Sequence, residues 1–109
     1  PESGAYGRIS GGDQTHINEV KYSFDGIAGD VTVYYEAWDV DMSDEVEILV
    51  NGQSAGFAPT TVNESWGSTQ TVVLPDGYVN DSSDNLLTFS NTYNPPKTYW
   101  WGIRNVTLP

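Results

Sequence analysis

Short runs of alternating apolar and polar residues, separated by clusters of turn-forming residues, most limit what this chain can fold into. The runs are rich in Val, Ile, Tyr, Phe and Thr, and 11 Gly and 6 Pro interrupt them together with many Asn, Asp and Ser residues. No window shows the sustained 3.6-residue periodicity that an amphipathic helix needs. The pattern is typical of an antiparallel β-sandwich or barrel.

Seven strands are expected from these runs. They span about 15–24, 30–38, 45–50, 53–58, 68–74, 85–90 and 98–108. In the segment 45–50, the even-numbered residues are expected to face the core and the odd-numbered residues, beginning with Glu45, to face solvent. Asn51-Gly52 follows directly, and this dipeptide predicts a tight hairpin because both turn positions need a positive φ.

The length and charge indicate one folded domain with an acidic surface. The 109 residues are expected to form a single domain, 1–109, and 4 Trp, 7 Tyr and 3 Phe argue against a disordered acidic chain. The net charge of −11 argues against nucleic acid and anionic membranes as partners, because phosphate binding needs clustered Lys and Arg. No apolar stretch approaches the ~20 residues of a membrane span.

The residues that catalysis most often uses are scarce. The chain has no Cys and one His, His16, and no nucleophile elbow surrounds any Ser. A domain of this size also leaves little room for a deep substrate cleft beside its core. The chain opens at Pro1 without a Met, which suggests a piece of a larger secreted protein. We therefore expect a binding module without catalytic activity.

Carboxylates without nearby bases are the most informative feature of the chain. No Lys or Arg occurs between Lys21 and Lys97, while twelve acidic residues occupy that span. Ion pairs within the span are excluded, so we expect each carboxylate to face water, to accept backbone N–H groups or to bind a cation. The densest group, residues 39–45, is called the acidic segment and contains Asp39, Asp41, Asp44 and Glu45.

A calcium ion would relieve the repulsion within the acidic segment, since it accepts 6–8 oxygen ligands at about 2.3–2.6 Å. Asp39 and Asp41 are spaced to aim two carboxylates the same way, and Asp44 and Glu45 can close from the far side. The segment is not an EF-hand, because Asp44 stands where that loop needs Gly and Val50 where it needs Glu. The alternative is a solvated acidic turn, and magnesium is disfavoured because a wholly protein-lined site suits calcium better.

Several aromatic residues are hard to place in one small core. Exposed rings among Asn, Asp and Glu suit sugar recognition, because a ring stacks on the C–H face of a pyranose while polar groups bind its hydroxyls. The alternative for any one of them is burial between two sheets, and of the adjacent pair Trp100 and Trp101 one is expected to point in and the other out. The ligand-binding candidates are Trp38, Trp66, Tyr93, Trp100 and Trp101.

The runs 18–24, 39–52 and 101–106 resemble bacterial calcium-binding β-sandwich carbohydrate-binding modules, which are appended to secreted polysaccharide-degrading enzymes and large surface proteins. The resemblance covers most of the chain from about Asn18. It implies a jelly-roll-type antiparallel β-sandwich and no catalysis. It also implies that the calcium ligands lie among Asp39, Asp41, Asp44 and Glu45, joined by Asn105.

The leading hypothesis is a secreted, monomeric, calcium-dependent carbohydrate-binding module without catalytic activity. It would hold covalently linked catalytic or surface-protein domains on a neutral polysaccharide such as xylan, a β-glucan or a galactan. The alternative is a calcium-stabilised structural or adhesin module that binds no sugar. A small catalytic domain that acts on glycans is the third and least favoured hypothesis.

Overall fold

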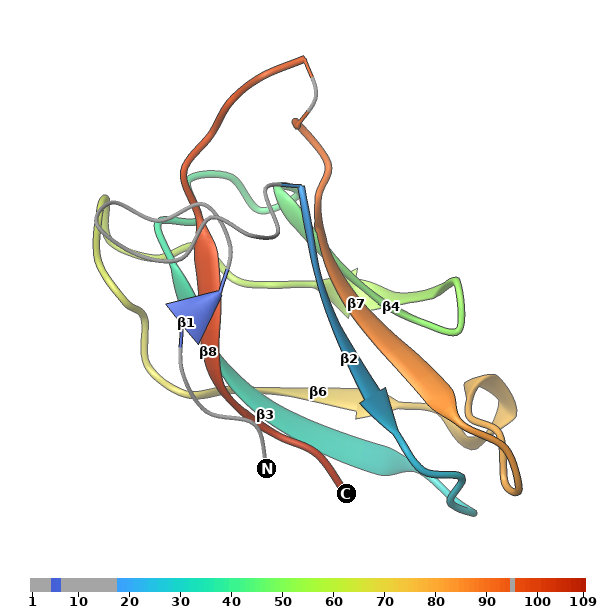
Figure 1. The fold of residues 1–109 in the computed structure, drawn as a ribbon. Coiled ribbons are helices and arrows are strands. Elements are labelled where there is room, and N and C mark those ends of the chain that lie inside the picture. Colours follow the sequence, from blue (N-terminus) through green and yellow to red (C-terminus); the bar gives the residue numbers. More distant parts are fainter. Residues whose placement is uncertain (1–4, 7–17, 95) are drawn as a thin grey trace.

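Two facing antiparallel sheets make up the computed structural model, which describes residues 5–6, 18–94 and 96–109 (Figure 1). One sheet contains, in spatial order, β1 (Ala5–Tyr6), β8 (Gly102–Thr107), β3 (Val31–Trp38) and β6 (Gln70–Leu74). The other contains β2 (Glu19–Phe24), β7 (Asn85–Asn91), β4 (Val46–Val50) and β5 (Gln53–Phe57).

The strand pairing is that of a jelly roll. β1 pairs with β8, β2 with β7, β3 with β6 and β4 with β5, all antiparallel. These pairs describe one long hairpin whose arms are rolled into two sheets, with the β4–β5 turn at its tip. The expected jelly-roll-type β-sandwich is therefore confirmed.

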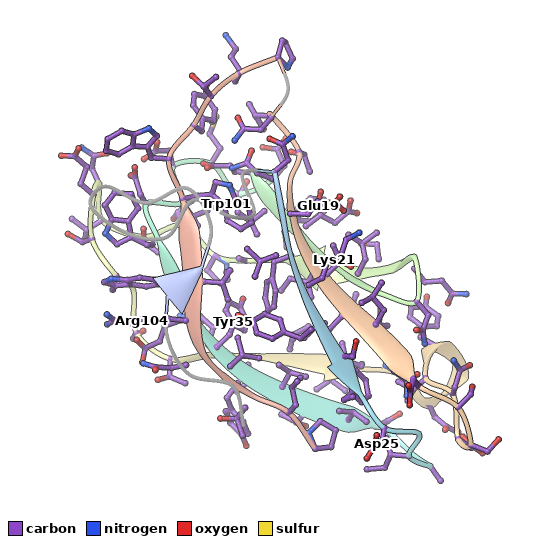
Figure 2. All side chains as sticks on the ribbon, viewed as in Figure 1. Glu19, Lys21, Asp25, Tyr35, Trp101 and Arg104 are labelled. Carbon is purple, nitrogen blue, oxygen red and sulfur yellow. The ribbon has the colours of Figure 1, made fainter. Side chains whose placement is uncertain are left out.

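The core lies between the sheets because the strands alternate in the expected way. Val20, Tyr22 and Phe24 of β2 are buried, while the residues between them are exposed. Tyr22 meets Phe89 edge-on, and Tyr35 contacts the same ring with centroids 5.2 Å apart. Figure 2 shows Tyr35 and Trp101 within the space that the two sheets enclose.

The turn at the tip of the long hairpin has the expected geometry. Asn51 and Gly52 have φ values of 51° and 83°, so both central positions adopt the left-handed conformation of a two-residue hairpin turn. The side chain of Asn51 also donates to the Tyr78 carbonyl and accepts from the Leu86 N–H. It thereby fastens the hairpin tip to the start of β7.

The predicted start of the last strand is wrong, and most of the predicted start of the first strand lies outside the described residues. The segment predicted to begin at 15 forms a strand from Glu19, and 15–17, with His16, lies outside the described residues. The last predicted strand, 98–108, begins only at Gly102, because Asn94 holds Tyr99 in a loop by two hydrogen bonds. The short β1 was not predicted, since two residues carry no pattern of their own.

The turn after β6 contains a one-turn 3₁₀ helix at Asp76–Tyr78. Pro75, Asp76 and Gly77 end β6 as the turn-forming dipeptides predict. None of the described residues forms a helix long and apolar enough to cross a membrane.

A β-bulge interrupts β8 where it pairs with β3. The register shifts by one residue between Tyr34↔Thr107 and Glu36↔Arg104, and Asn105 has a φ of 53°. Asn tolerates this left-handed conformation better than most residues. The extra residue leaves Arg104 and Asn105, although adjacent in sequence, both outside the core between the buried Ile103 and Val106.

Candidate functional site

Asp39 begins the acidic segment in a strained and buried position. It follows β3 directly, has a φ of 57° and is largely buried. Its Oδ1 accepts the Glu64 N–H at 3.0 Å, and its own N–H donates to the Ser65 carbonyl. Burial raises the pKa of the Asp39 carboxyl, and the Asp41 carboxylate, close enough to share a hydrogen bond with it, raises it further. A buried and an exposed acidic group therefore meet here.

Glu45 is the last residue of the acidic segment, and its carboxylate is fully buried. Its Oε1 accepts the Asp41 N–H at 2.8 Å, and its Oε2 accepts from Nδ2 of Asn91 at 2.9 Å. Burial raises the pKa of Glu45 although these bonds and the Met42 N–H oppose the effect. The expectation that Glu45 faces solvent is wrong: β4 begins only at Val46, so the alternation of that strand does not extend to Glu45.

No base neutralises the acidic segment among the described residues. The described residues form two ion pairs, Lys21 with Glu19 and Arg104 with Glu36, and neither pair includes a residue of the acidic segment. The Glu36 pair corrects one expectation, because Arg104 comes from outside the base-free span and pairs with a carboxylate inside it. Among the described residues, the Asp39 carboxylate accepts the Glu64 N–H, and the Glu45 carboxylate accepts the Asp41 N–H and the Asn91 side-chain amide.

Asp44 points to the loop between β7 and β8. Its Oδ1 accepts the Tyr93 hydroxyl at 2.8 Å, and its carbonyl accepts the Thr92 hydroxyl at 2.6 Å. The bond to Asp44 raises the pKa of Tyr93. The acidic segment and this loop are therefore fastened together although they lie about fifty residues apart in the sequence.

The loop that Asp44 contacts is held in shape by its own residues. Asn94 is buried, donates to the Tyr99 carbonyl and accepts the Tyr99 N–H. The rings of Tyr93 and Tyr99 pack with centroids 5.6 Å apart, and Trp100, next to them in sequence, is 40% exposed. We call Tyr93, Tyr99 and Trp100 the aromatic loop.

The predicted metal ligands fall into three places. Asp39 and Asp41 meet in the acidic segment, and the Glu45 carboxylate accepts the Asp41 N–H. Asp44 accepts a hydrogen bond from Tyr93, and Asn105 donates to Glu36 on the outer face of the β1-β8-β3-β6 sheet. Within the described part of the chain, no three His or acidic side chains gather closely enough to hold a metal by themselves. A calcium ion at Asp39 and Asp41 would therefore need carbonyl oxygens or water as further ligands.

The predicted ligand-binding aromatics separate by burial. Trp38 and Trp101 are both buried, and Trp101 belongs to the core between the sheets, whereas Trp66 and Tyr93 are half-buried and Trp100 is exposed. The expectation for the Trp100 and Trp101 pair, one in and one out, agrees with this burial. Of the five candidates, Trp66, Tyr93 and Trp100 thus keep side-chain surface exposed to solvent.

Trp66 belongs to a second polar group, which the sequence did not predict. The Arg104 guanidinium lies 4.1 Å from the centre of the Trp66 ring, and its Nε donates to Oε1 of Glu36 at 2.8 Å. Asn105 donates to the same oxygen at 3.2 Å. We call these four residues the outer-face cluster. Alternation in β3 could have placed Glu36 outside the core, but only the pairing of β3 with β8 brings Arg104 to it.

Comparison with protein-family models, known protein sequences and solved structures finds no match to this chain.

Proposed function

We propose that this chain is a non-catalytic, calcium-dependent carbohydrate-binding module of a secreted protein. It would keep an attached enzyme on a neutral polysaccharide such as xylan, a β-glucan or a galactan. The observation that carries the proposal is the 2.8 Å hydrogen bond from Tyr93 to Asp44, because it joins the acidic segment to the aromatic loop. A cation bound at one would thus hold the other in position.

Calcium is supported by the chemistry of the acidic segment. Burial and the nearby Asp41 carboxylate raise the pKa of Asp39, so the ionised pair is destabilised in the folded chain. A hard cation reverses this effect, since it favours the charged carboxylates and accepts carbonyl oxygens as further ligands. In this proposal Asp39 and Asp41 hold the ion, and the Glu45 carboxylate fixes the Asp41 backbone by accepting its N–H.

Sugar binding is supported by the shape and chemistry of the aromatic loop. Tyr99 and Trp100 offer rings, and Asn94 limits the loop's freedom by its two bonds to Tyr99. A ligand platform that is ordered in advance loses less entropy on binding. The polar groups of the acidic segment stand beside these rings and could bind sugar hydroxyls directly or through the ion.

Affinity electrophoresis on a panel of soluble neutral polysaccharides tests the proposal. We expect retardation on at least one of them in calcium, and loss of retardation in EDTA. Trp100→Ala should reduce the retardation, and Tyr78→Ala is the control because Tyr78 is also a partly exposed ring but lies in the 3₁₀ helix after β6. If the wild-type chain migrates in every polysaccharide gel as it does in a gel without polysaccharide, the sugar-binding proposal is wrong.

The second candidate is a calcium-stabilised structural or adhesin module. The bond from Asn91 to Glu45 favours it, since this bond ties the start of β4 to the end of β7 and needs no ligand to be useful. This candidate predicts that EDTA lowers the melting temperature while no polysaccharide retards the chain. The gel panel and a melting curve together separate the two candidates.

A further inference from the structure

We infer that the outer face of the β1-β8-β3-β6 sheet is a second contact surface for a neutral saccharide chain, centred on the outer-face cluster and extending to Tyr34. The inference rests on the proposed function and extends it, because it places part of the ligand away from the aromatic loop. It predicts that this part of the binding does not need calcium.

The β-bulge in β8 is what assembles this surface. In a regular strand, adjacent residues point to opposite faces, so Arg104 and Asn105 could not both lie on one side. The extra residue at Asn105, with its positive φ, turns both side chains to the outer face, where both donate to Glu36. Bulges are frequent next to functional sites because they re-aim side chains in this way. Figure 2 shows Arg104 on the side of its sheet away from the other sheet.

The outer-face cluster keeps unused hydrogen-bonding capacity at the surface. A guanidinium has five N–H donors, and only the Nε group of Arg104 has a hydrogen-bond partner among the described residues. The side chains of Arg104 and Glu36 remain 36% and 19% exposed. The remaining donors are held in a fixed orientation by the Glu36 bond and the Trp66 ring, so a ligand hydroxyl would meet an ordered group.

The rest of this face is aromatic and rich in hydroxyl groups. Tyr34 precedes Glu36 by two residues on the same face of β3 and is 45% exposed. Thr71 of β6 and Thr107 of β8 lie opposite Tyr34 on its two sides, and both are exposed. The backbone positions of Tyr34 and Glu36 are thus about 7 Å apart along the strand, which suits a ligand that is extended rather than compact.

The charge of this face selects a neutral, polyhydroxylated ligand. Glu36 and Arg104 balance one another, and the net charge of −11 would repel a polyanion. Sugar hydroxyls can donate to Glu36 and the Thr side chains while they accept from Arg104 and Asn105. A protein partner is less suitable, because Val73 and Tyr34 are the large apolar side chains exposed on this face in the described strands, and a stable interface needs a larger apolar centre.

An NMR titration locates the contacts. The wild-type chain is titrated with oligosaccharides of the polysaccharide that retards it in the gel. Backbone amide and Trp indole signals are followed in calcium and again in EDTA. We expect shifts at Tyr34, Glu36, Arg104 and the Trp66 indole in both conditions, and shifts at the aromatic loop in calcium only. Shifts confined to the aromatic loop would overturn the inference and leave the proposed function standing. No shift with any oligosaccharide would remove both.

Tyr34→Ala provides the matched variant for the same titration. We expect about a tenfold weaker affinity, as for the loss of one stacked ring. Phe57→Ala is the control, since Phe57 is also 45% exposed but belongs to β5 in the other sheet. Arg104→Met keeps an apolar side chain on Trp66 and should weaken binding as well. Wild-type affinity in both Tyr34→Ala and Arg104→Met, with folded spectra, would also overturn the inference.

Discussion

The Tyr35 ring packs against Phe89 in the core, and its hydroxyl has no hydrogen-bond partner among the described residues. Burying an unsatisfied hydroxyl costs about 1–3 kcal/mol, so Tyr35→Phe should leave the free energy of unfolding at pH 7 unchanged or raise it. Urea denaturation measures this. The control is Tyr34→Phe, which removes a hydroxyl from the surface.

The same substitution has a stronger signature at high pH. Burial raises the pKa of Tyr35 from 10.0 to about 12. The unfolded chain then loses this proton first, so the stabilisation by the neutral ring is complete below pH 10 and is lost between pH 10 and 12, by roughly 3 kcal/mol. Tyr35→Phe should lose less stability than the wild type across that interval. Equal losses in the two chains would contradict the assignment.

Glu36 should give the opposite dependence on pH. The hydrogen bond from Arg104 holds the pKa of Glu36 below its ordinary value of 4.5. Its contribution to stability is therefore present above that value and is lost as the pH falls through the lower folded pKa. The melting temperature of Glu36→Gln should fall below that of the wild type at pH 7, and the difference should shrink at pH 3. A difference that persists at pH 3 would show that packing, rather than the charge, is responsible.

The bulge at Asn105 determines which face of the sheet the side chains of β8 lie on. The positive φ of Asn105 allows the need for the bulge to be tested by substitution. Asn105→Ala places a residue with a Cβ, but without a local hydrogen bond, at a φ of 53°. The left-handed conformation costs such a residue roughly 1–2 kcal/mol. Asn105→Gly loses the same bond to Glu36 but adopts this φ without that cost. In urea denaturation the Ala variant should therefore be less stable than the Gly variant by about 1 kcal/mol. The reverse order would mean that the bulge is not required.

The strands and the hairpin of β4 with β5 were predicted from the sequence, but the pairing of strands distant in the sequence was not, for a physical reason. The period-2 pattern of β2 and β3 is local, so Val20 and Val33 could be placed in the core from sequence alone. The contacts of Glu36 with Arg104 and of Asp44 with Tyr93 join residues 68 and 49 positions apart. They arise from the order of strands in each sheet and from a bulge, which leave no local pattern. The acidic segment was recognised because its charges are adjacent in the sequence.

The whole molecule carries a net charge of −11, and its response to cations should separate general screening from a specific site. Added NaCl should raise the melting temperature of the EDTA-treated chain gradually, because it screens repulsion between exposed carboxylates. Calcium should act at far lower ionic strength if it binds the folded acidic segment. At a hundredfold excess over Kd this binding would contribute about 2.7 kcal/mol, which corresponds to a shift of roughly 10–20 °C for a domain of this size.

Two double variants remove equal charge from different places and make this comparison decisive. Asp39→Asn with Asp41→Asn should abolish the shift in calcium and keep the gradual rise in NaCl. Asp81→Asn with Asp84→Asn, in an exposed turn where Asn80 donates to the Asp84 carbonyl, should keep both responses. Magnesium should stabilise less than calcium, because it requires stricter geometry and retains its water. If calcium acts no more strongly than NaCl of equal ionic strength, the acidic segment is a solvated turn, and the bond of Glu45 to Asn91 alone explains its order.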